Sequence, residues 1–484
     1  MELLGTVDWS GRIFSGGWVE GGGQTYSAVE PATGQTLGQV GAASAADVDR
    51  AVGLGREAQP LWAAMSYQAR AAVLRRAADL LEAHHHEVED WSMREAGVPR
   101  YWAGVAGPAE ELRQAASLAS FPRGQVLPST EPRLSFTRRI PVGVVGVIAP
   151  FNAPLMLAVR SLAPALAVGN AVVLKPDPRT AVCGGVLLAR VFQEAGLPSD
   201  VLHVLPGGQD VGRQLVAHPD VPVIAFTGSA AAGRAVAELA APLLKRVHLE
   251  LGGNSALVVF EDADVEQAAV AGCVGSFMHA GQVCMAASRH LVAAPLVSDY
   301  TALLAERAGQ LPVGNPIDAD VAYGPLIDAT ARDRVHRIVQ DSVGAGARLV
   351  TGGTYEELFY RPTVLTDVPQ TARAYQEEIF GPVAPIVGFG NLQEAARLAA
   401  GTGYGLSLGI ITKDVMAGIN FAEQIPVGMV HINDQTITDE PIAPFGGMGL
   451  SGNGARVGGL DTNLDAFTEV QWVTAQAGPG GYPF

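Results

Sequence analysis

Cysteine is scarce in this chain, which has only three in 484 residues: Cys183, Cys273 and Cys284. A small and odd number of cysteines does not suggest a disulfide framework, so we expect a protein of the reducing cytoplasm. The first residues place acidic side chains before any basic cluster and contain no apolar run of signal-peptide length. Nothing in the sequence therefore predicts export.

Positive charge and long apolar runs are also lacking. The 32 Lys and Arg residues are outnumbered by 48 Asp and Glu, for a net charge of -16. This balance argues against a nucleic-acid partner, because cations must neutralise the phosphates. The most apolar long stretch, residues 155–174, is interrupted by Arg160, Pro164, Gly169 and Asn170. We therefore expect a soluble protein without a membrane partner.

Three consecutive histidines, His84 to His86, lie within a helical pattern that extends from about residue 44 to residue 96. Consecutive side chains on a helix point in different directions, so the three imidazoles are not expected to share one metal ion. We interpret them as part of a solvated helix face and predict no metal site.

What the chain has is the composition of a compact α/β enzyme, with 58 glycines and 31 prolines for tight turns. Its length exceeds that of one ordinary hydrophobic core, which suggests two or three domains. From Pro141, short apolar runs alternate with helical stretches, a rhythm that predicts a Rossmann-type parallel sheet. A second α/β block follows Leu251. We therefore expect a dinucleotide-type domain of residues 1–120 and 140–251 and a catalytic domain of residues 252–465. Exposed strand edges are usually covered by a partner, so we expect residues 121–139 and 466–484 to form a β-element for oligomerisation.

Two segments fit the binding of a phosphate-containing ligand. Gly228, Ser229 and Gly233 lie between an apolar strand and a helix, where backbone amides at the helix N-terminus suit a pyrophosphate. The alternative is that these glycines only let helix and strand pack closely. Lys175 directly follows a predicted strand and so faces the ligand crevice of such a sheet, unless it is a solvated loop lysine.

Cys284 is the candidate nucleophile. It lies among small and polar residues that let a substrate approach, whereas Cys183 and Cys273 lie in apolar helical runs. A free cysteine is often only a small core residue, so the interpretation depends on residues that would assist the thiol.

Two residues qualify as such helpers. Asn152, held between prolines after a strand, is a candidate oxyanion donor, with an Asx turn as the alternative. Glu250 ends an apolar segment and precedes two glycines that leave room beside it. It is a candidate general base, or else the ion-pair partner of Lys245 or Arg246.

Two further motifs match known patterns in letters only. The segment after Gly228 resembles a P-loop, but Arg234 takes the lysine position and Ala235 the serine or threonine position, which disfavours triphosphatase chemistry. The segment Gly405-Leu406-Ser407-Leu408-Gly409 matches the nucleophile elbow of serine hydrolases. An apolar strand continues after its serine, where an elbow must turn into a helix.

Taken together, the chain resembles the aldehyde dehydrogenase superfamily from about residue 25 to residue 470. The matching motifs occur in the expected order: Pro150 to Pro154, Lys175-Pro176, Phe226 to Gly233, Glu250 to Asn254, Gly281 to Met285, Glu377 to Val383, and Pro444 to Gly447 with Ser451-Gly452. The resemblance implies the fold of that family, with a Rossmann-type cofactor domain, an α/β catalytic domain and a small β oligomerisation element, in a homodimer or homotetramer.

The resemblance also implies NAD(P)-dependent oxidation of an aldehyde to the carboxylic acid. Cys284 is expected to form a thiohemiacetal and then a thioester, while Asn152 and the Cys284 backbone amide hold the oxyanion. Glu250 is expected to activate the hydrolytic water, which favours hydrolysis over acyl transfer to coenzyme A. The expected cofactor contacts are Ile148, Lys175, Asp177, Gly228, Ser229, Gly233, Leu251, Gly252, Glu378 and Phe380.

The choice between the two cofactors depends on Pro178. Many NAD-preferring relatives have a glutamate at this position, which binds the adenosine ribose. Asp177 is a candidate substitute, whereas Arg179 has the charge to attract the 2′-phosphate of NADP. We predict NAD, with NADP as the alternative.

The predicted substrate is an aromatic aldehyde, because the segments around Lys175, Cys284 and Phe445 resemble the benzaldehyde, vanillin and salicylaldehyde dehydrogenase branch. Aliphatic aldehydes or semialdehydes are the alternative. The expected pocket wall, in which Phe151 replaces the tryptophan of many relatives, consists of Phe151, Met156, Arg160, Phe277, Val283, Met285 and Ile437. Three different functions compete with this hypothesis: an acylating dehydrogenase, a cysteine esterase with His279 or His290 as base, and a catalytically silent binding protein of this fold.

Overall fold

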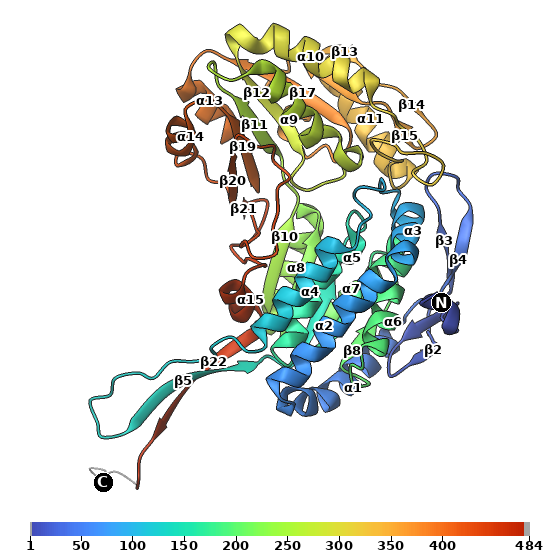
Figure 1. The fold of residues 1–484 in the computed structure, drawn as a ribbon, viewed down its shortest axis with the longest axis vertical. Helices are drawn as coiled ribbons and strands as arrows, with labels where there is room; N and C mark the ends of the chain where they lie inside the picture. Colours follow the sequence, from blue (N-terminus) through green and yellow to red (C-terminus); the bar gives the residue numbers. More distant parts are fainter. Residues whose placement is uncertain (1, 479–484) are drawn as a thin grey trace.

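The computed structural model describes residues 2–478, and two seven-stranded sheets form its framework (Figure 1). In the first sheet, five parallel strands are extended at one edge by two antiparallel strands. The strands in spatial order are β10 (Arg246–Leu251), β9 (Val223–Gly228), β6 (Val144–Ile148), β7 (Ala171–Lys175), β8 (Leu202–Val204), β1 (Arg12–Phe14) and β2 (Trp18–Glu20). The parallel sheet predicted from Pro141 onward is thus confirmed.

Each face of the first sheet has a hydrophobic core of its own, because side chains alternate along a strand. In β7, Val172 and Leu174 belong to one core, and Ala171 and Val173 belong to the other. Both faces are covered, so these strands are apolar without interruption. One core is closed by α2 (Tyr67–Ala83), α3 (His85–Ala96), α4 (Ala106–Leu118), α5 (Pro154–Ala167) and α6 (Leu187–Glu194), the other by α1 (Ala45–Ala64), α7 (Gln209–Ala217) and α8 (Ala230–Ala240).

The second sheet is parallel except for its edge strand β13. Its strands in spatial order are β13 (Arg348–Thr351), β16 (Thr363–Thr366), β17 (Val383–Phe389), β12 (Ala287–Ala293), β11 (Ser255–Val259), β19 (Ser407–Ile411) and β20 (Met429–Ile432). The accompanying helices are α9 (Val265–Phe277), α10 (Val297–Gln310), α11 (Ala329–Gly344), α12 (Arg373–Gln376), α13 (Leu392–Ala399) and α14 (Val415–Ala422). We call the parts built on the two sheets the first-sheet unit and the second-sheet unit. Short two-stranded pairs are β3 (Tyr26–Val29) with β4 (Thr36–Val40), β14 (Tyr355–Glu356) with β15 (Phe359–Tyr360), and β18 (Tyr404–Gly405) with β21 (Met448–Gly449).

A two-stranded arm projects from the body of the molecule (Figure 1). It consists of β5 (Leu134–Pro141) and β22 (Thr468–Ala475), which pair antiparallel along their full length. The two segments that the sequence analysis assigns to one β-element therefore pair with each other. The regular strand begins only at Leu134 rather than at residue 121, and residues 479–484 of that prediction lie outside the described part of the chain.

Helix α15 (Leu460–Phe467), just before the arm, belongs to the first-sheet unit. Its residues Leu464, Ala466 and Phe467 are buried in the core that α4 and α5 help to form. The apolar face of this helix, which spans the predicted domain boundary at residue 465, therefore packs in the first core.

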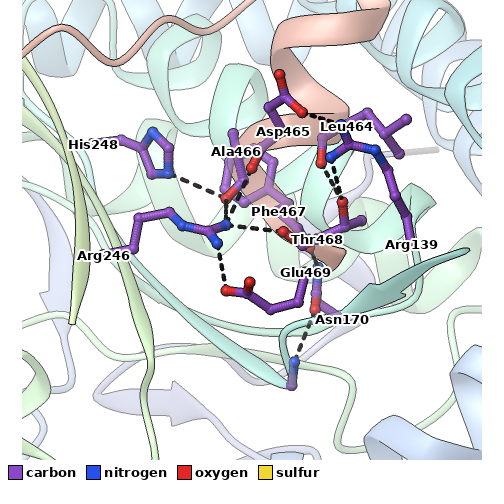
Figure 2. A network of polar contacts seen from close by, with 11 residues as sticks. Arg139, Asn170, Arg246, His248, Leu464, Asp465, Ala466, Phe467, Thr468 and Glu469 are labelled. Atoms are coloured by element: carbon purple, nitrogen blue, oxygen red, sulfur yellow. Dashed lines mark hydrogen bonds and ion pairs between the residues drawn. The ribbon is translucent and has the colours of Figure 1, made fainter. Parts of the chain in front are cut away.

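Arg246, at the start of β10, fixes the end of α15 and the base of the arm (Figure 2). Its guanidinium pairs with Glu469 and donates to the carbonyl groups of Asp465, Ala466 and Thr468. Carbonyl groups at a helix C-terminus have no partner within the helix, so a cation there satisfies them. The base of the arm is thus attached to the strand that also carries Glu250.

The histidine run differs from its prediction. His84 adopts a non-helical conformation between α2 and α3, and the rings of His85 and His86 lie 3.8 Å apart. Together with Glu89 they place three potential ligand atoms within 4.8 Å of one another. The expectation that these side chains diverge is wrong for this pair, although both residues belong to α3. The cluster is solvent-accessible and lies at a helix N-terminus, whose dipole disfavours a cation.

Within residues 2–478, no helix combines the length and the apolar character that crossing a membrane requires.

Candidate active site

One cavity of about 920 Å³ lies where the parallel strands of the first sheet end and the second-sheet unit begins. Strand order reverses around β6, with β7 on one side and β9 on the other, and such a reversal opens a ligand crevice at the carboxyl ends of the strands. Of the residues singled out in the sequence, the lining includes Ile148, Phe151, Asn152, Arg160, Lys175, Asp177, Gly228, Ser229, Glu250, Leu251, Gly252, Cys284, Glu378 and Phe380.

Six expected site residues lie outside this lining. A Cβ on Gly233 would lie 2.5 Å from a methyl carbon of Leu251, so this glycine lets α8 pack closely on β10. Phe277 is 2% exposed and belongs to the core of the second-sheet unit. Met156 faces Gly107 instead. Val283, Met285 and Ile437 form a small apolar cluster with Cys284 at its margin.

The cofactor half of the cavity carries positive charge from two sources. Gly228, Ser229 and Ala230 line it where α8 begins, and the positive end of the helix dipole lies there. Lys175 is 7% exposed, and Pro176 O is its one hydrogen-bond acceptor among residues 2–478. Burial lowers the pKa of Lys175. An ammonium with unused donors beside a helix N-terminus fits an anionic dinucleotide.

Arg179 joins several groups of the cavity wall. Its guanidinium binds both oxygens of Asp177 at 2.9 Å and Asp328 Oδ2 at 2.7 Å, and it stacks on the Phe151 ring at 4.2 Å. The Phe151 ring in turn meets Phe380 edge-on at 5.9 Å. Arg179 is therefore committed to two carboxylates, and the suggestion that it attracts a 2′-phosphate is not supported.

Glu378 closes the opposite side of the cavity. Its Oε1 accepts from Gly253 N at 3.2 Å, and burial raises the pKa of Glu378 to about 7. A Cβ atom on Gly252 would lie 2.0 Å from Glu378 Oε2, so the carboxylate of Glu378 can lie against this segment only because residue 252 is a glycine. Arg334, which sequence reasoning missed, donates to the backbone carbonyls of Glu378 and Ile379 and holds this segment.

Asn152 is held in place by the segment that carries the thiol. Its Nδ2 donates to Gln282 O at 2.9 Å, and Gln282 is fully buried, with Ile327 N donating to its Oε1 at 3.0 Å. An amide group has two N–H donors, so one fixes the side chain and the other remains for a ligand. The Asn152 side chain thus bonds to a residue 130 positions away in the chain, whereas the alternative Asx turn would bond it to a neighbouring residue.

Cys284 follows three consecutive residues with positive φ: His279, Ala280 and Gly281. A Cβ on Gly281 would lie 2.2 Å from Gly381 O, so only glycine fits this turn. Burial, together with the carboxylates of Glu378, Asp439 and Glu250, raises the pKa of the Cys284 thiol to about 12. The thiol is therefore protonated at neutral pH and needs a base or a nearby positive charge to react.

Glu250 is 4% exposed and lines the cavity, and neither of its oxygens finds a hydrogen-bond partner in the described chain. Burial raises the pKa of Glu250 well above its usual value. The alternative ion pairs are not formed, since Arg246 binds the base of the arm and Lys245 donates to His218 O. A buried carboxylate with free oxygens suits a general base.

Beyond the thiol, Arg160 forms a buried cluster that the sequence did not reveal. Its guanidinium binds Glu111 at 2.9 Å, pairs with Asp439 and lies 5.0 Å above the ring of Phe445. Phe445 and Val457 line the cavity, and Trp102 packs against the same apolar cluster as Cys284. The motif from Pro444 to Gly447 made Phe445 recognisable in the sequence as a candidate site residue. Glu111, Asp439 and Trp102 lie in segments that contain no such motif.

The other candidate nucleophiles and bases are occupied or buried. Cys183 and Cys273 lie in hydrophobic cores. His290 binds Ser276 and Tyr300 through its two ring nitrogens, so neither nitrogen is free to serve Cys284. Ser407 lies inside β19 and donates to Thr436 O, which confirms that its motif is not a nucleophile elbow.

A dinucleotide-type cavity that contains a thiol, an amide donor and a buried carboxylate is the arrangement expected of an oxidoreductase with a cysteine nucleophile. The model of the aldehyde dehydrogenase family matches residues 18–473, and the chain belongs to that family. Vanillin dehydrogenase of Amycolatopsis sp. is 57% identical over 100% of both chains, and benzaldehyde dehydrogenase (NAD(+)) of Pseudomonas putida is 48% identical over 98% of both. The NAD+ complex of aldehyde dehydrogenase from Bacillus cereus superimposes with a TM-score of 0.93 at 34% identity, covering 97% of both chains. The resemblance inferred from the motifs is confirmed.

Proposed function

We propose that the protein oxidises an aromatic aldehyde of the benzaldehyde type to its carboxylic acid with NAD or NADP. The observation that carries the proposal is the meeting of Cys284, Asn152 and Glu250 on one cavity, beside apolar side chains suited to a ring. Two relatives with high identity over nearly the whole chain are named for vanillin and benzaldehyde, which supports an aromatic substrate.

The chemistry assigned to these residues proceeds through a covalent thioester. Cys284 reacts as the thiolate: its thiol proton passes to water, Sγ bonds to the aldehyde carbon, and the free N–H of Asn152, together with the Cys284 backbone amide, holds the resulting oxyanion. When bound, the nicotinamide of the cofactor supplies the two-electron acceptor of the oxidation. Glu250 then takes a proton from water, which attacks the thioester carbon and releases the acid and the Cys284 thiolate.

For the cofactor we propose NAD, with NADP as the alternative. Asp177 and Pro178 line the cavity after β7, and the carboxylate of Asp177, although Arg179 binds both of its oxygens, keeps further lone pairs as a candidate partner of ribose hydroxyl groups. The observation that favours NADP is Arg213, which lines the same cavity and forms no ion pair within the described residues. Phosphate attracts such a free guanidinium. A loss of NADP turnover in Arg213→Ala, with NAD turnover retained, would identify this arginine as the phosphate ligand.

The test of the proposed function is a panel of aldehydes assayed with both cofactors, on the wild-type protein and on Cys284→Ala. We expect saturation at low concentration by benzaldehydes and no turnover by the variant. Low-concentration saturation by short aliphatic aldehydes but not by benzaldehyde would refute the aromatic substrate. Ester hydrolysis lost in His279→Ala but not in Glu250→Gln would favour the cysteine esterase instead.

We also propose a homo-oligomer, in which the arm covers apolar surface of another copy of the chain. Leu134, Val470 and Trp472 on the arm are 53%, 57% and 62% exposed. The second sheet ends in an open edge at β20, where Val430 is 40% exposed. Light scattering of the wild-type protein and of a chain ending before β22 tests the role of the arm.

For the domains we retain the predicted boundary after Leu251, which lies between β10 of the first sheet and β11 of the second sheet.

A further inference from the structure

Arg456 lies beside the buried carboxylate of Glu250, and the glycine between the two side chains, Gly446, allows this approach. Gly446 separates the two side chains, and a Cβ on it would lie 2.7 Å from Arg456 Cδ and 3.0 Å from Glu250 Oε1. Any other residue at Gly446, whose φ is +154°, would push one of them away. The glycine therefore brings the arginine stem and the glutamate into one neighbourhood.

The guanidinium of Arg456 is positioned by backbone and not by another charge. Its Nη1 donates to Gly447 O at 3.1 Å and to Ala455 O at 2.8 Å. Carbonyl groups fix its place without neutralising it, and Arg456 forms no ion pair among residues 2–478. The positive charge next to Glu250 is thus uncompensated.

The other charged groups that face Glu250 are Arg160, on α5, and Asp439, in the loop after β20. Arg160 is already bound to two carboxylates, Glu111 and Asp439. That cluster contains two negative charges for one positive charge, so it gives Glu250 little net stabilisation in its ionised form. Arg456 is the cation that remains to offset the burial of this carboxylate.

We propose that Arg456 is a positioning residue that acts through Glu250: its guanidinium is the counter-charge that keeps the general base ionised while it activates water. The inference rests on the proposed role of Glu250 in thioester hydrolysis. In agreement with it, the charge of Arg456 opposes the rise that burial causes in the pKa of Glu250. Arg456 touches neither water nor thioester in this role.

The test compares Arg456→Gln, which removes the charge but keeps an N–H donor for Gly447 O, with Arg456→Lys, which keeps the charge. Each protein is acylated at Cys284 with p-nitrophenyl benzoate, and decay of the benzoyl adduct is followed by intact-protein mass spectrometry between pH 5 and pH 10. This readout measures hydrolysis alone, without the cofactor. The matched control is Arg76→Gln, because Arg76 also donates to a backbone carbonyl, Ala195 O, and is not among the residues that line the cavity.

Loss of a neighbouring cation raises the pKa of a carboxyl group by about one unit, and only ionised Glu250 accepts the proton from water. Hydrolysis in Arg456→Gln should therefore be about tenfold slower on the acidic side of the profile and reach the wild-type plateau at high pH. Arg456→Lys and Arg76→Gln should follow the wild type.

An unshifted profile in Arg456→Gln, or a rate lowered equally at all pH values, would overturn the inference, because the first shows no electrostatic effect and the second a structural one. Glu250→Gln separates this from the proposed function. If Glu250→Gln hydrolyses the adduct at the wild-type rate, the role of Glu250 itself fails. If Glu250→Gln is inactive and Arg456→Gln is unchanged, only the role of Arg456 fails.

Discussion

Arg179 Nη1 donates to Asp328 Oδ2 at 2.7 Å, and this ion pair joins the first-sheet unit to the second-sheet unit beside the cofactor cavity. Arg179 follows β7, whereas Asp328 is the N-cap of α11, whose side chain also accepts from Ala331 N. With Phe151 stacked beneath the guanidinium and Phe380 against that ring, the pair fixes the cavity wall from both sides.

Asp328→Ser should weaken cofactor binding without unfolding α11, because serine is a good N-cap but cannot pair with Arg179. The two side chains are 40% and 34% exposed, so the solvent-screened loss is about 0.2–1 kcal/mol, or up to about fivefold in Kd and in the release rate of NADH. Stopped-flow NADH fluorescence measures both. Asp264→Ser is the control, since Asp264 caps α9 and forms no ion pair within residues 2–478. Equal effects in both variants would show that the Arg179–Asp328 pair contributes nothing to cofactor binding.

Alkylation of Cys284 by iodoacetamide, in the absence of substrate and cofactor, should accelerate with pH. The thiolate is the reactive form, and the pKa of this thiol is raised to about 12, so the rate should rise about tenfold per pH unit between pH 7 and 9. Mass spectrometry of the intact protein follows the reaction, with Cys284→Ala as the unlabelled control. A plateau below pH 8 would contradict the prediction, because it would reveal a thiolate at neutral pH.

Asn152→Ala should lower kcat for aldehyde oxidation by about 100- to 1000-fold, the usual loss when an oxyanion donor is removed. One N–H of the Asn152 amide already donates to Gln282 O, so the substitution removes the second N–H, which is the proposed donor to the oxyanion. Affinity for the cofactor, measured by fluorescence titration, should stay within about twofold of the wild type. A fall in cofactor affinity as large as the fall in kcat would instead indicate that the wall of the cavity has collapsed.

Arg246→Ala should destabilise the protein by about 1–3 kcal/mol, because it leaves several carbonyl groups at the end of α15 without their donor. Urea denaturation measures the change in the free energy of unfolding. Arg348→Ala is the matched control, since its ion pair with Asp367 has both side chains at least 64% exposed and should contribute almost nothing. Similar losses in the two variants would rule out a special role for the network of Figure 2.

Much of the fold was predictable from the sequence because its signals are local. Apolar runs such as Val172 to Leu174, buried on both faces of a sheet, identify parallel strands without reference to the rest of the chain. The position of α15 was not predictable in this way. Its apolar face fits either core in principle, and the long-range packing of Phe467 decides for the first.

The site was predictable to the extent that chemistry resides in short motifs. Loops after parallel strands meet at one edge of a sheet, so Asn152, Lys175, Ser229 and Glu250 were expected together and do line one cavity. Phe277 has the right residue type and lies seven residues before Cys284, but its side chain turns into the core of the second-sheet unit.

The sequence by itself determined the candidate site residues and the order in which the strands and helices follow one another, because both depend on neighbours along the chain. The tertiary structure decided the state of those residues: that Arg179 is bound to Asp328, that Glu250 has no hydrogen-bond partner among the described residues, and that Arg456 lies next to it. The Arg179–Asp328 pair and the approach of Arg456 to Glu250 each join segments more than a hundred residues apart, and only the packed fold brings such segments into contact.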